Sequence, residues 1–152
     1  MAEVCSNSSL GNLVKRVVNI IAAIAVVVAV VACAEPAKVE YAGQLVEMND
    51  SLLIAGVSDT LHFGRMHSGE IAVKTLAIKN MTSEPMVVLR HETTCHCATI
   101  TYSKQPLMPG EQSEIRFEFD SRGAYGWQMK LANFYIAGAE RPLRVFIEAE
   151  IE

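Results

Sequence analysis

The fold is decided by an alternating stretch near the C-terminus, Leu143-Arg144-Val145-Phe146-Ile147-Glu148-Ala149-Glu150-Ile151. Apolar side chains occupy every odd position, and charged side chains occupy every even position except that of Phe146. Because successive side chains of a β-strand point to opposite faces, this pattern predicts a strand with one buried face and one solvated face. A strand of this kind needs a second layer of structure to cover its apolar face.

The same alternation recurs upstream, most clearly in residues 112–120, where Ile115, Phe117 and Phe119 alternate with charged residues. Turn-forming residues such as Gly69, and the proline and glycine of Pro109-Gly110, separate stretches of strand length. The expected strands cover residues 60–64, 71–80, 86–91, 100–102, 112–120, 127–136 and 143–151. Short strands at this spacing predict an all-β fold, an immunoglobulin-like antiparallel β-sandwich of about seven strands.

The N-terminal region has the features of an export signal. Lys15 and Arg16 precede an apolar run, residues 17–32, that ends in Val30-Val31-Ala32-Cys33. A basic region, an apolar region and a small residue before the cleavage point are the parts of a secretory signal. The branched residues, the alanine and the cysteine resemble a bacterial lipobox, in which the cysteine receives lipid. The alternative is an uncleaved apolar membrane helix, since the run is near the roughly 17 to 25 residues that a span needs.

We therefore expect three segments. Residues 1–32 are a lipoprotein signal peptide, residues 33–58 are the lipidated Cys33 followed by a tether with room for one edge strand, and residues 59–152 are the sandwich domain. This places the domain in the cell envelope, anchored through palmitate and other lipid at Cys33 to the outer membrane, on its periplasmic or its surface face. With a net charge of −4, the chain offers no basic patch for nucleic acid.

The one stretch that holds candidate chemistry is Thr93-Thr94-Cys95-His96-Cys97-Ala98-Thr99. In an oxidising compartment the two cysteines are either thiols or a disulfide that caps a strand end. If the segment is extended, their Cα atoms lie roughly 6.5 Å apart, at the upper edge of disulfide geometry.

Two further interpretations of this stretch remain open. Cys95, His96 and Cys97 could supply soft ligands for zinc or copper, with a further ligand from His62, His67 or His91. They could also form a redox thiol pair, although no helix N-terminus is present to lower a thiol pKa. No acid and base pair or phosphate loop accompanies the stretch, so we expect no enzyme, no catalytic residues, no cofactor and no resident metal.

Several motifs occur in the order and spacing of a known bacterial family. They are Phe63-Gly64, Gly69-Glu70, Asn80, Pro85, Cys95-His96-Cys97-Ala98-Thr99, Pro106-Leu107-Met108-Pro109-Gly110-Glu111 and Phe119-Asp120-Ser121. Over residues 59–152 the chain resembles the domain-of-unknown-function 1573 family. The family pattern has Gly between the cysteines and Thr after them, where this chain has His96 and Ala98. The resemblance implies an immunoglobulin-like extracytoplasmic module and implies no reaction.

The expected role is therefore a binding or structural module of an exported lipoprotein, with an envelope protein or a glycan as partner. The alternative is a periplasmic metal-binding or thiol-redox protein that uses Cys95, His96 and Cys97. Trp127, Phe134 and Tyr135 at strand spacing are typical of core and rim positions, whereas a cluster of Tyr125, Trp127 and Tyr135 would favour carbohydrate contact. Phe146, apolar on a charged face, is a candidate partner contact.

Overall fold

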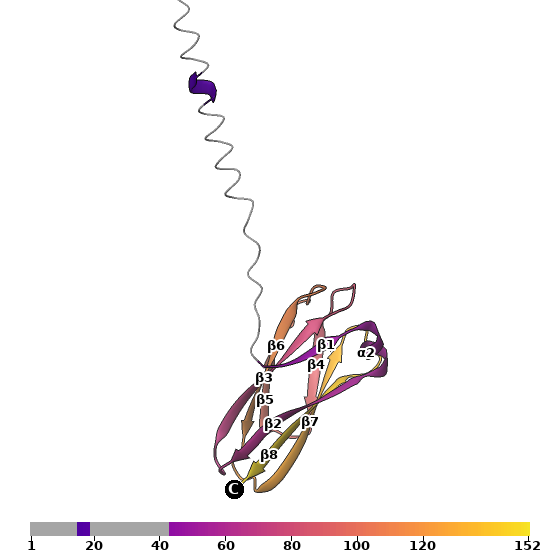
Figure 1. Ribbon diagram of the computed structural model, residues 1–152. Coiled ribbons are helices and arrows are strands. Elements are labelled where there is room, and N and C mark those ends of the chain that lie inside the picture. The colour runs from indigo at the N-terminus through magenta and orange to yellow at the C-terminus, as the bar shows by residue number, and fades with distance from the viewer. Residues whose placement is uncertain (1–14, 19–42) are drawn as a thin grey trace, which may run out of the picture. The chain divides into compact units, whose positions relative to one another are not determined.

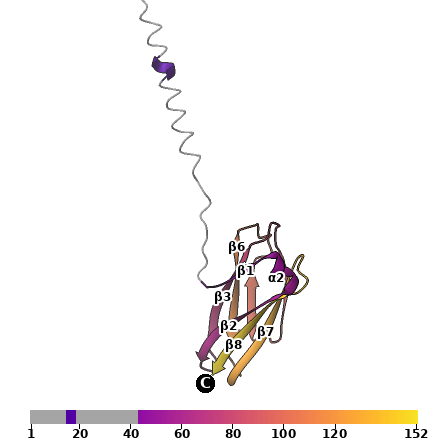
Figure 2. The ribbon, with the colours of Figure 1, turned by 45° about the vertical axis from the view of Figure 1, so that its right-hand side comes forward.

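The computed structural model describes residues 15–18 and 43–152 of the chain. Residues 15–18 are helical, and residues 43–152 form a sandwich of two four-stranded sheets (Figures 1 and 2). The first sheet has the strand order β1-β3-β6-β5 and the second has the order β2-β8-β7-β4. The elements are β1 (Gln44–Met48), α2 (Asp50–Ala55), β2 (Val57–Met66), β3 (Ile71–Asn80), β4 (Val88–Thr93), β5 (Ala98–Tyr102), β6 (Gln112–Asp120), β7 (Gly126–Ile136) and β8 (Leu143–Ile151). The predicted immunoglobulin-like sandwich is confirmed.

Strand direction differs from the prediction at one side of the sandwich. β1 pairs with β3 in parallel, and β2 pairs with β8 in parallel, while the other pairs are antiparallel. The chain passes from the first sheet to the second between β1 and β2, so neither strand forms a hairpin with its partner. Side-chain alternation is the same in both directions, which is why the sequence could not reveal these pairings.

The sandwich begins earlier than residue 59. The expected tether, residues 33–58, includes β1, α2 and the first two residues of β2. β1 is the edge strand for which the sequence left room, and its Val46 and Met48 are buried. α2 starts where the Asn49 side chain accepts a hydrogen bond from the Leu52 amide at 3.0 Å. The predicted signal peptide and the lipidation site Cys33 lie outside the described residues, apart from residues 15–18.

No helix in the described part of the chain combines the length and the apolar character that crossing a bilayer requires.

The core lies between the sheets and follows the predicted alternation. From β8 the odd-numbered residues are buried, and from β6 Ile115, Phe117 and Phe119 are fully buried. The rings of Phe117 and Phe134 meet edge to face with centroids 5.8 Å apart, which joins the two sheets at their centre. The sequence pattern thus identified the core-facing positions of both strands.

A buried asparagine fixes the loops at one end of the sandwich. Asn80 Nδ2 donates to the carbonyl oxygens of Glu84 and Leu107, each at 2.8 Å. Its Oδ1 accepts from the Thr82 amide at 2.9 Å and from the Thr82 hydroxyl at 2.7 Å. A fully buried amide needs such partners, because leaving one unsatisfied costs about 1 to 3 kcal/mol. Asn80 therefore holds two turns together.

Candidate functional site: the disulfide turn between β4 and β5

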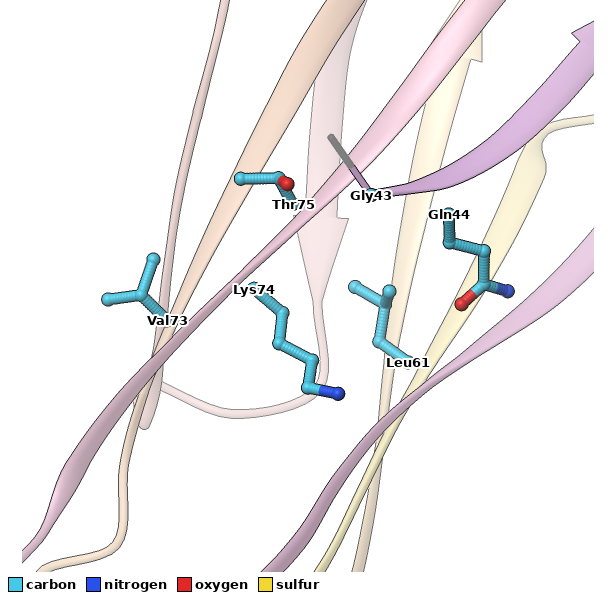
Figure 3. Close-up of a pocket in the computed structure, with 6 residues that line it drawn as sticks. All are labelled: Gly43, Gln44, Leu61, Val73, Lys74 and Thr75. Carbon is cyan, nitrogen blue, oxygen red and sulfur yellow. The ribbon is translucent and has the colours of Figure 1, made fainter. Parts of the chain in front are cut away.

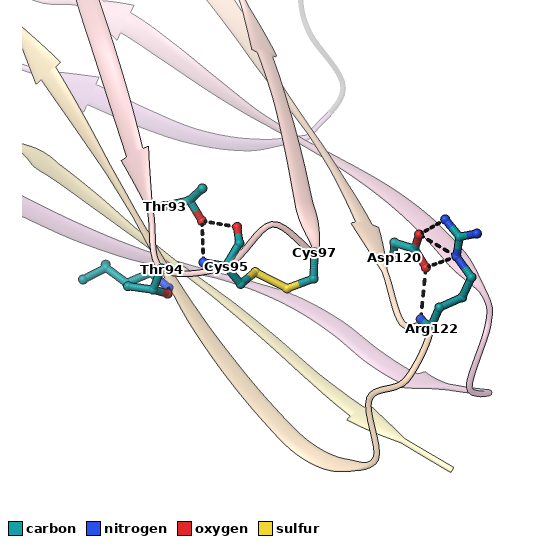
Figure 4. The surroundings of a disulfide bond; sticks show 7 residues. Thr93, Thr94, Cys95, Cys97, Asp120 and Arg122 are labelled. Atoms are coloured by element: carbon teal, nitrogen blue, oxygen red, sulfur yellow. Dashed lines mark hydrogen bonds and ion pairs between the residues drawn. A yellow bond between two sulfur atoms is a disulfide. The ribbon is translucent and has the colours of Figure 1, made fainter.

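A disulfide closes the turn that carries the chain from one sheet to the other. β4 ends at Thr93 in the second sheet, and β5 begins at Ala98 in the first. Between them Cys95 and Cys97 are joined, with their Cα atoms 5.3 Å apart (Figure 4). The separation of roughly 6.5 Å that applies to an extended segment is not found, because the chain forms a turn here.

Hydrogen bonds hold both stems of this turn independently of the sulfur atoms. On the β4 side the Thr94 amide donates to the Leu131 carbonyl, and the Leu131 amide donates to Thr94 Oγ1, each at 3.0 Å. The Thr93 hydroxyl donates to the Cys95 carbonyl at 3.2 Å (Figure 4). On the β5 side the Asp120 amide donates to the Cys97 carbonyl at 2.8 Å. The cysteines are therefore positioned by two separate sheets.

The charges beside the turn are internally neutralised. Arg122 binds the Asp120 carboxylate through both its side chain and its backbone amide (Figure 4). These hydrogen bonds hold the pKa of Asp120 below its ordinary value, and the same contact raises the pKa of Arg122. Asp120 is thus an anion committed to Arg122 rather than a proton acceptor for a reaction.

An aromatic contact between β4 and β5 engages one candidate histidine. His91 on β4 lies 3.3 Å from the Tyr102 hydroxyl on β5, and the two rings meet edge to face. The His91 ring also contacts the Phe134 ring, with centroids 5.9 Å apart. Burial raises the pKa of Tyr102, so this hydroxyl stays protonated. The contact joins β4 and β5, the edge strands of the two sheets.

The remaining histidines do not converge on the cysteines. His96 is exposed on the turn, His67 is exposed elsewhere, and His62 pairs with Glu148 at 3.3 Å on the second sheet. Within the described residues no three metal-ligating side chains form a group. In the disulfide state each sulfur is bonded to the other, so a metal site at Cys95, His96 and Cys97 requires reduction first and stays a prediction.

The candidate sugar platform is divided between two ends of β7. Trp127 and Tyr135 lie on the same outward face, but eight residues of strand span about 26 Å. Arg90 covers the Tyr135 ring with its guanidinium carbon 3.6 Å from the centroid, while Tyr125 in the preceding loop is 83% exposed. Phe134 belongs to the core. The candidate carbohydrate-binding residues Tyr125, Trp127 and Tyr135 therefore do not form one cluster.

Phe146 does have an apolar neighbour on the outer face of the second sheet. It is half-buried on β8 and lies opposite Leu131 on β7 in the strand register. Met129 and Trp127, two and four residues earlier, are exposed on the same face. Met129 and Leu131 were not predicted from the sequence, although their odd-numbered spacing with Trp127 was a usable signal.

A shallow pocket lies at the opposite side of the sandwich, where β1 begins beside β3. Its volume is about 340 Å³, and Figure 3 shows the residues that line it: Gly43, Gln44, Leu61, Val73, Lys74 and Thr75. This lining contains one cation and no carboxylate or imidazole. It therefore holds no acid and base pair of the kind that general catalysis needs.

The fold and the disulfide turn define an immunoglobulin-like domain whose two sheets are joined by a Cys-x-Cys loop. The model of the family described as protein of unknown function (DUF1573) matches residues 54–151, and the chain belongs to this family. A search of curated proteins gave no match. These results confirm the resemblance seen in the sequence.

Two solved structures share the fold. A protein of unknown function from Porphyromonas gingivalis W83 aligns with a TM-score of 0.54 at 18% identity, over 76% of this chain and 51% of that one. The VesB protease of Vibrio cholerae aligns with a TM-score of 0.50 at 13% identity, over 61% of this chain and 30% of that one. This chain thus spans about half of the first protein and under a third of the second. At such identities the likeness concerns the fold alone.

Proposed function

We propose that this protein is an exported lipoprotein whose immunoglobulin-like domain serves as a non-catalytic binding or structural module of the cell envelope. The observation that carries this proposal is the Cys95–Cys97 disulfide. Such bonds persist in secreted and periplasmic proteins and are rare where glutathione and thioredoxin keep thiols reduced. The disulfide and the export signal point to the same compartment by separate routes.

The proposed anchor is lipid attached to Cys33 at the end of the signal peptide. Acyl chains on one cysteine hold a protein at the membrane through the burial of their methylene groups, at about 0.8 kcal/mol each. The domain then stands on the outer membrane, facing either the periplasm or the outside, where an envelope protein or glycan is its partner.

The non-catalytic part of the proposal is supported by the chemistry of the turn and the pocket. Asp120 is paired with Arg122, His91 is engaged with Tyr102, and the two sulfur atoms are bonded to each other. The net charge of −4 argues against nucleic acid as partner. These contacts favour binding through exposed side chains over catalysis at the disulfide turn.

The test of export and lipidation uses the full chain expressed in a bacterial host with radiolabelled palmitate. We expect label in the wild type and in Cys5→Ser, which is the matched control, and none in Cys33→Ser. Both labelled proteins should fractionate with membranes and carry no free thiol at Cys95 or Cys97. Label that survives Cys33→Ser, or free thiols in a cytosolic protein, would contradict the proposal.

The second candidate function is thiol-redox or metal chemistry at Cys95, His96 and Cys97. It is favoured by one observation, namely that the hydrogen bonds of Thr94 and Asp120 hold the two stems without involving either sulfur atom. In the test, dithiothreitol supplies two electrons and two protons to the disulfide and becomes a disulfide itself. Stoichiometric zinc on the reduced full chain, lost in His96→Ala, would support the metal form.

A further inference from the structure

The first half of β7 has an unpaired edge. β4 pairs with β7 from Ala132 to Ile136, and the hydrogen bonds between Thr94 and Leu131 form the last rung. On the N-terminal side of Leu131, residues 126–130 of β7 have β8 as their single neighbouring strand within the described chain. We call this stretch the open β7 edge.

The backbone groups on this edge can be identified from the alternation of an antiparallel ladder. Both backbone groups of Leu131 point toward Thr94, so those of Met129 and Trp127 point the same way, whereas those of Gln128 and Lys130 face β8. No backbone partner in the described chain occupies this side of Met129 or Trp127. Two donors and two acceptors are therefore free to pair with an added strand.

The side chains of the open β7 edge differ between its two faces. On the outward face Trp127 is 59% exposed and Met129 is 45% exposed. On the inward face Lys130 is half-buried opposite the buried Ile147, and within the described chain no carboxylate lies at ion-pair distance from it. One face therefore offers apolar contact, and the other offers a cation without a counter-charge.

The edge is open because the chain leaves the second sheet after Thr94. Cys97 is already tied to the first sheet through the Asp120 amide, and its Cα atom lies 5.3 Å from that of Cys95. The chain therefore cannot continue along β7 beyond Thr94. This crossing to the first sheet ends the pairing of β4 with β7 and leaves its continuation available to another chain.

We propose that the open β7 edge binds an extended peptide segment of a partner protein, as an added β-strand that pairs with β7 beyond the end of β4. Strand addition of this kind takes affinity from backbone hydrogen bonds and specificity from alternate side chains. Here the partner's outward side chains are apolar and contact Trp127 and Met129, and its inward side chains are acidic and pair with Lys130. This inference rests on the proposed binding module and names the chemistry of its partner.

A second copy of this chain fits the edge less well. If two β7 edges paired, each Lys130 would lie on the inward face beside the other, and like charges across a strand pair are destabilising. Inward-pointing lysines on edge strands commonly oppose such edge-to-edge association. An added strand with an acidic inward side chain would instead form an ion pair with Lys130.

The experiment measures peptide binding to the full chain in detergent micelles. The probe is a fluorescent peptide of about seven residues in which valine alternates with glutamate. Matched peptides carry lysine in place of glutamate, or methyl groups on the alternate backbone nitrogens. We expect saturable binding of the first peptide alone, because the second repels Lys130 and the third lacks backbone donors. No saturable binding, or equal binding of the lysine peptide, would overturn the proposal.

Location is tested by substitution and by amide hydrogen exchange. Lys130→Glu should weaken binding of the glutamate peptide by about tenfold or more, while Lys104→Glu, in an exposed loop, leaves it unchanged. The amides of Trp127 and Met129 should exchange quickly in the free protein and slowly with peptide bound. Protection on another strand, or protection without peptide that grows with protein concentration, would overturn the assignment, the latter in favour of a second copy.

Soluble glycan fragments form a further arm of the same measurement. Displacement of the valine and glutamate peptide by glycan, without protection of the Met129 amide, would replace the peptide partner with a carbohydrate. Export and lipidation are measured separately at Cys33, so either result can fail without the other.

Discussion

The two halves of β7 differ although they form one continuous strand. Residues 132–136 pair with β4, residues 132–134 also pair with β8, and the inward side chains Ala132, Phe134 and Ile136 are buried. Residues 126–130 have β8 as neighbour on one side, and their inward side chains Gln128 and Lys130 are polar and half-buried. The two halves therefore have the same conformation, and they differ in whether β4 lies beside them and in the polarity and burial of their inward side chains.

The largest expected effect tests this difference on one face of one strand. Phe134→Ala should lower the free energy of unfolding by about 3 to 5 kcal/mol, because it leaves a cavity between the sheets. Lys130→Ala, four residues earlier on the same face, should change it by no more than about 0.5 kcal/mol. Urea denaturation followed by tryptophan fluorescence measures both. Similar losses for the two variants would show that the halves are not distinct.

The disulfide turn that separates the halves should matter less for stability. The ring that it closes spans only Cys95 to Cys97, and the chain-entropy relation gives about 1.5 kcal/mol for so small a loop. The double variant Cys95→Ser/Cys97→Ser should thus lose about that amount and keep the fold, since the bonds of Thr94 and Asp120 remain. Loss of the native circular dichroism spectrum at room temperature would contradict this.

The inward charge should control association of the open half more than it controls stability. Lys130→Leu should self-associate at lower protein concentration than the wild type, because it removes the barrier to pairing of two β7 edges. Lys130→Arg, which keeps the charge, is the matched control and should behave as the wild type. Sedimentation velocity over a dilution series makes the measurement. Unchanged association of Lys130→Leu would show that this edge is closed by other means.

The smallest effect concerns the closed half and pH. The hydrogen bond from Tyr135, followed by that from Arg90, lowers the pKa of Glu92 below its ordinary value of 4.5. A carboxylate with a lowered folded pKa contributes stability above the unfolded value and loses it as pH falls through the folded value. The difference in melting temperature between the wild type and Tyr135→Phe should therefore be present at neutral pH and shrink below pH 4.5. A difference that stays constant with pH would exclude this contact as its source.

Much of the sandwich could be predicted because alternation is a local property. The alternating pattern predicted the burial of the odd positions of β8 and of the phenylalanines of β6, and turn residues indicated where strands end. Strand direction and the start of the domain were not predicted, since pairing partners such as β2 and β8 are far apart in the chain. Gln128 and Lys130, polar at inward positions, were the signal for the open β7 edge, but their meaning depends on where β4 stops.

The candidate functional residues were likewise predicted only in part from the sequence. The sequence alone located Cys95 and Cys97 and singled out the aromatic residues of β7, because residue type and spacing are enough to recognise them. Only the tertiary structure decided that the cysteines close a turn between two sheets, that Tyr135 lies under Arg90, and that one edge of β7 has no partner strand over residues 126–130 within the described chain. Those outcomes depend on contacts between residues distant in the chain, and a one-dimensional pattern determines which face a side chain takes but not which strand lies beside it.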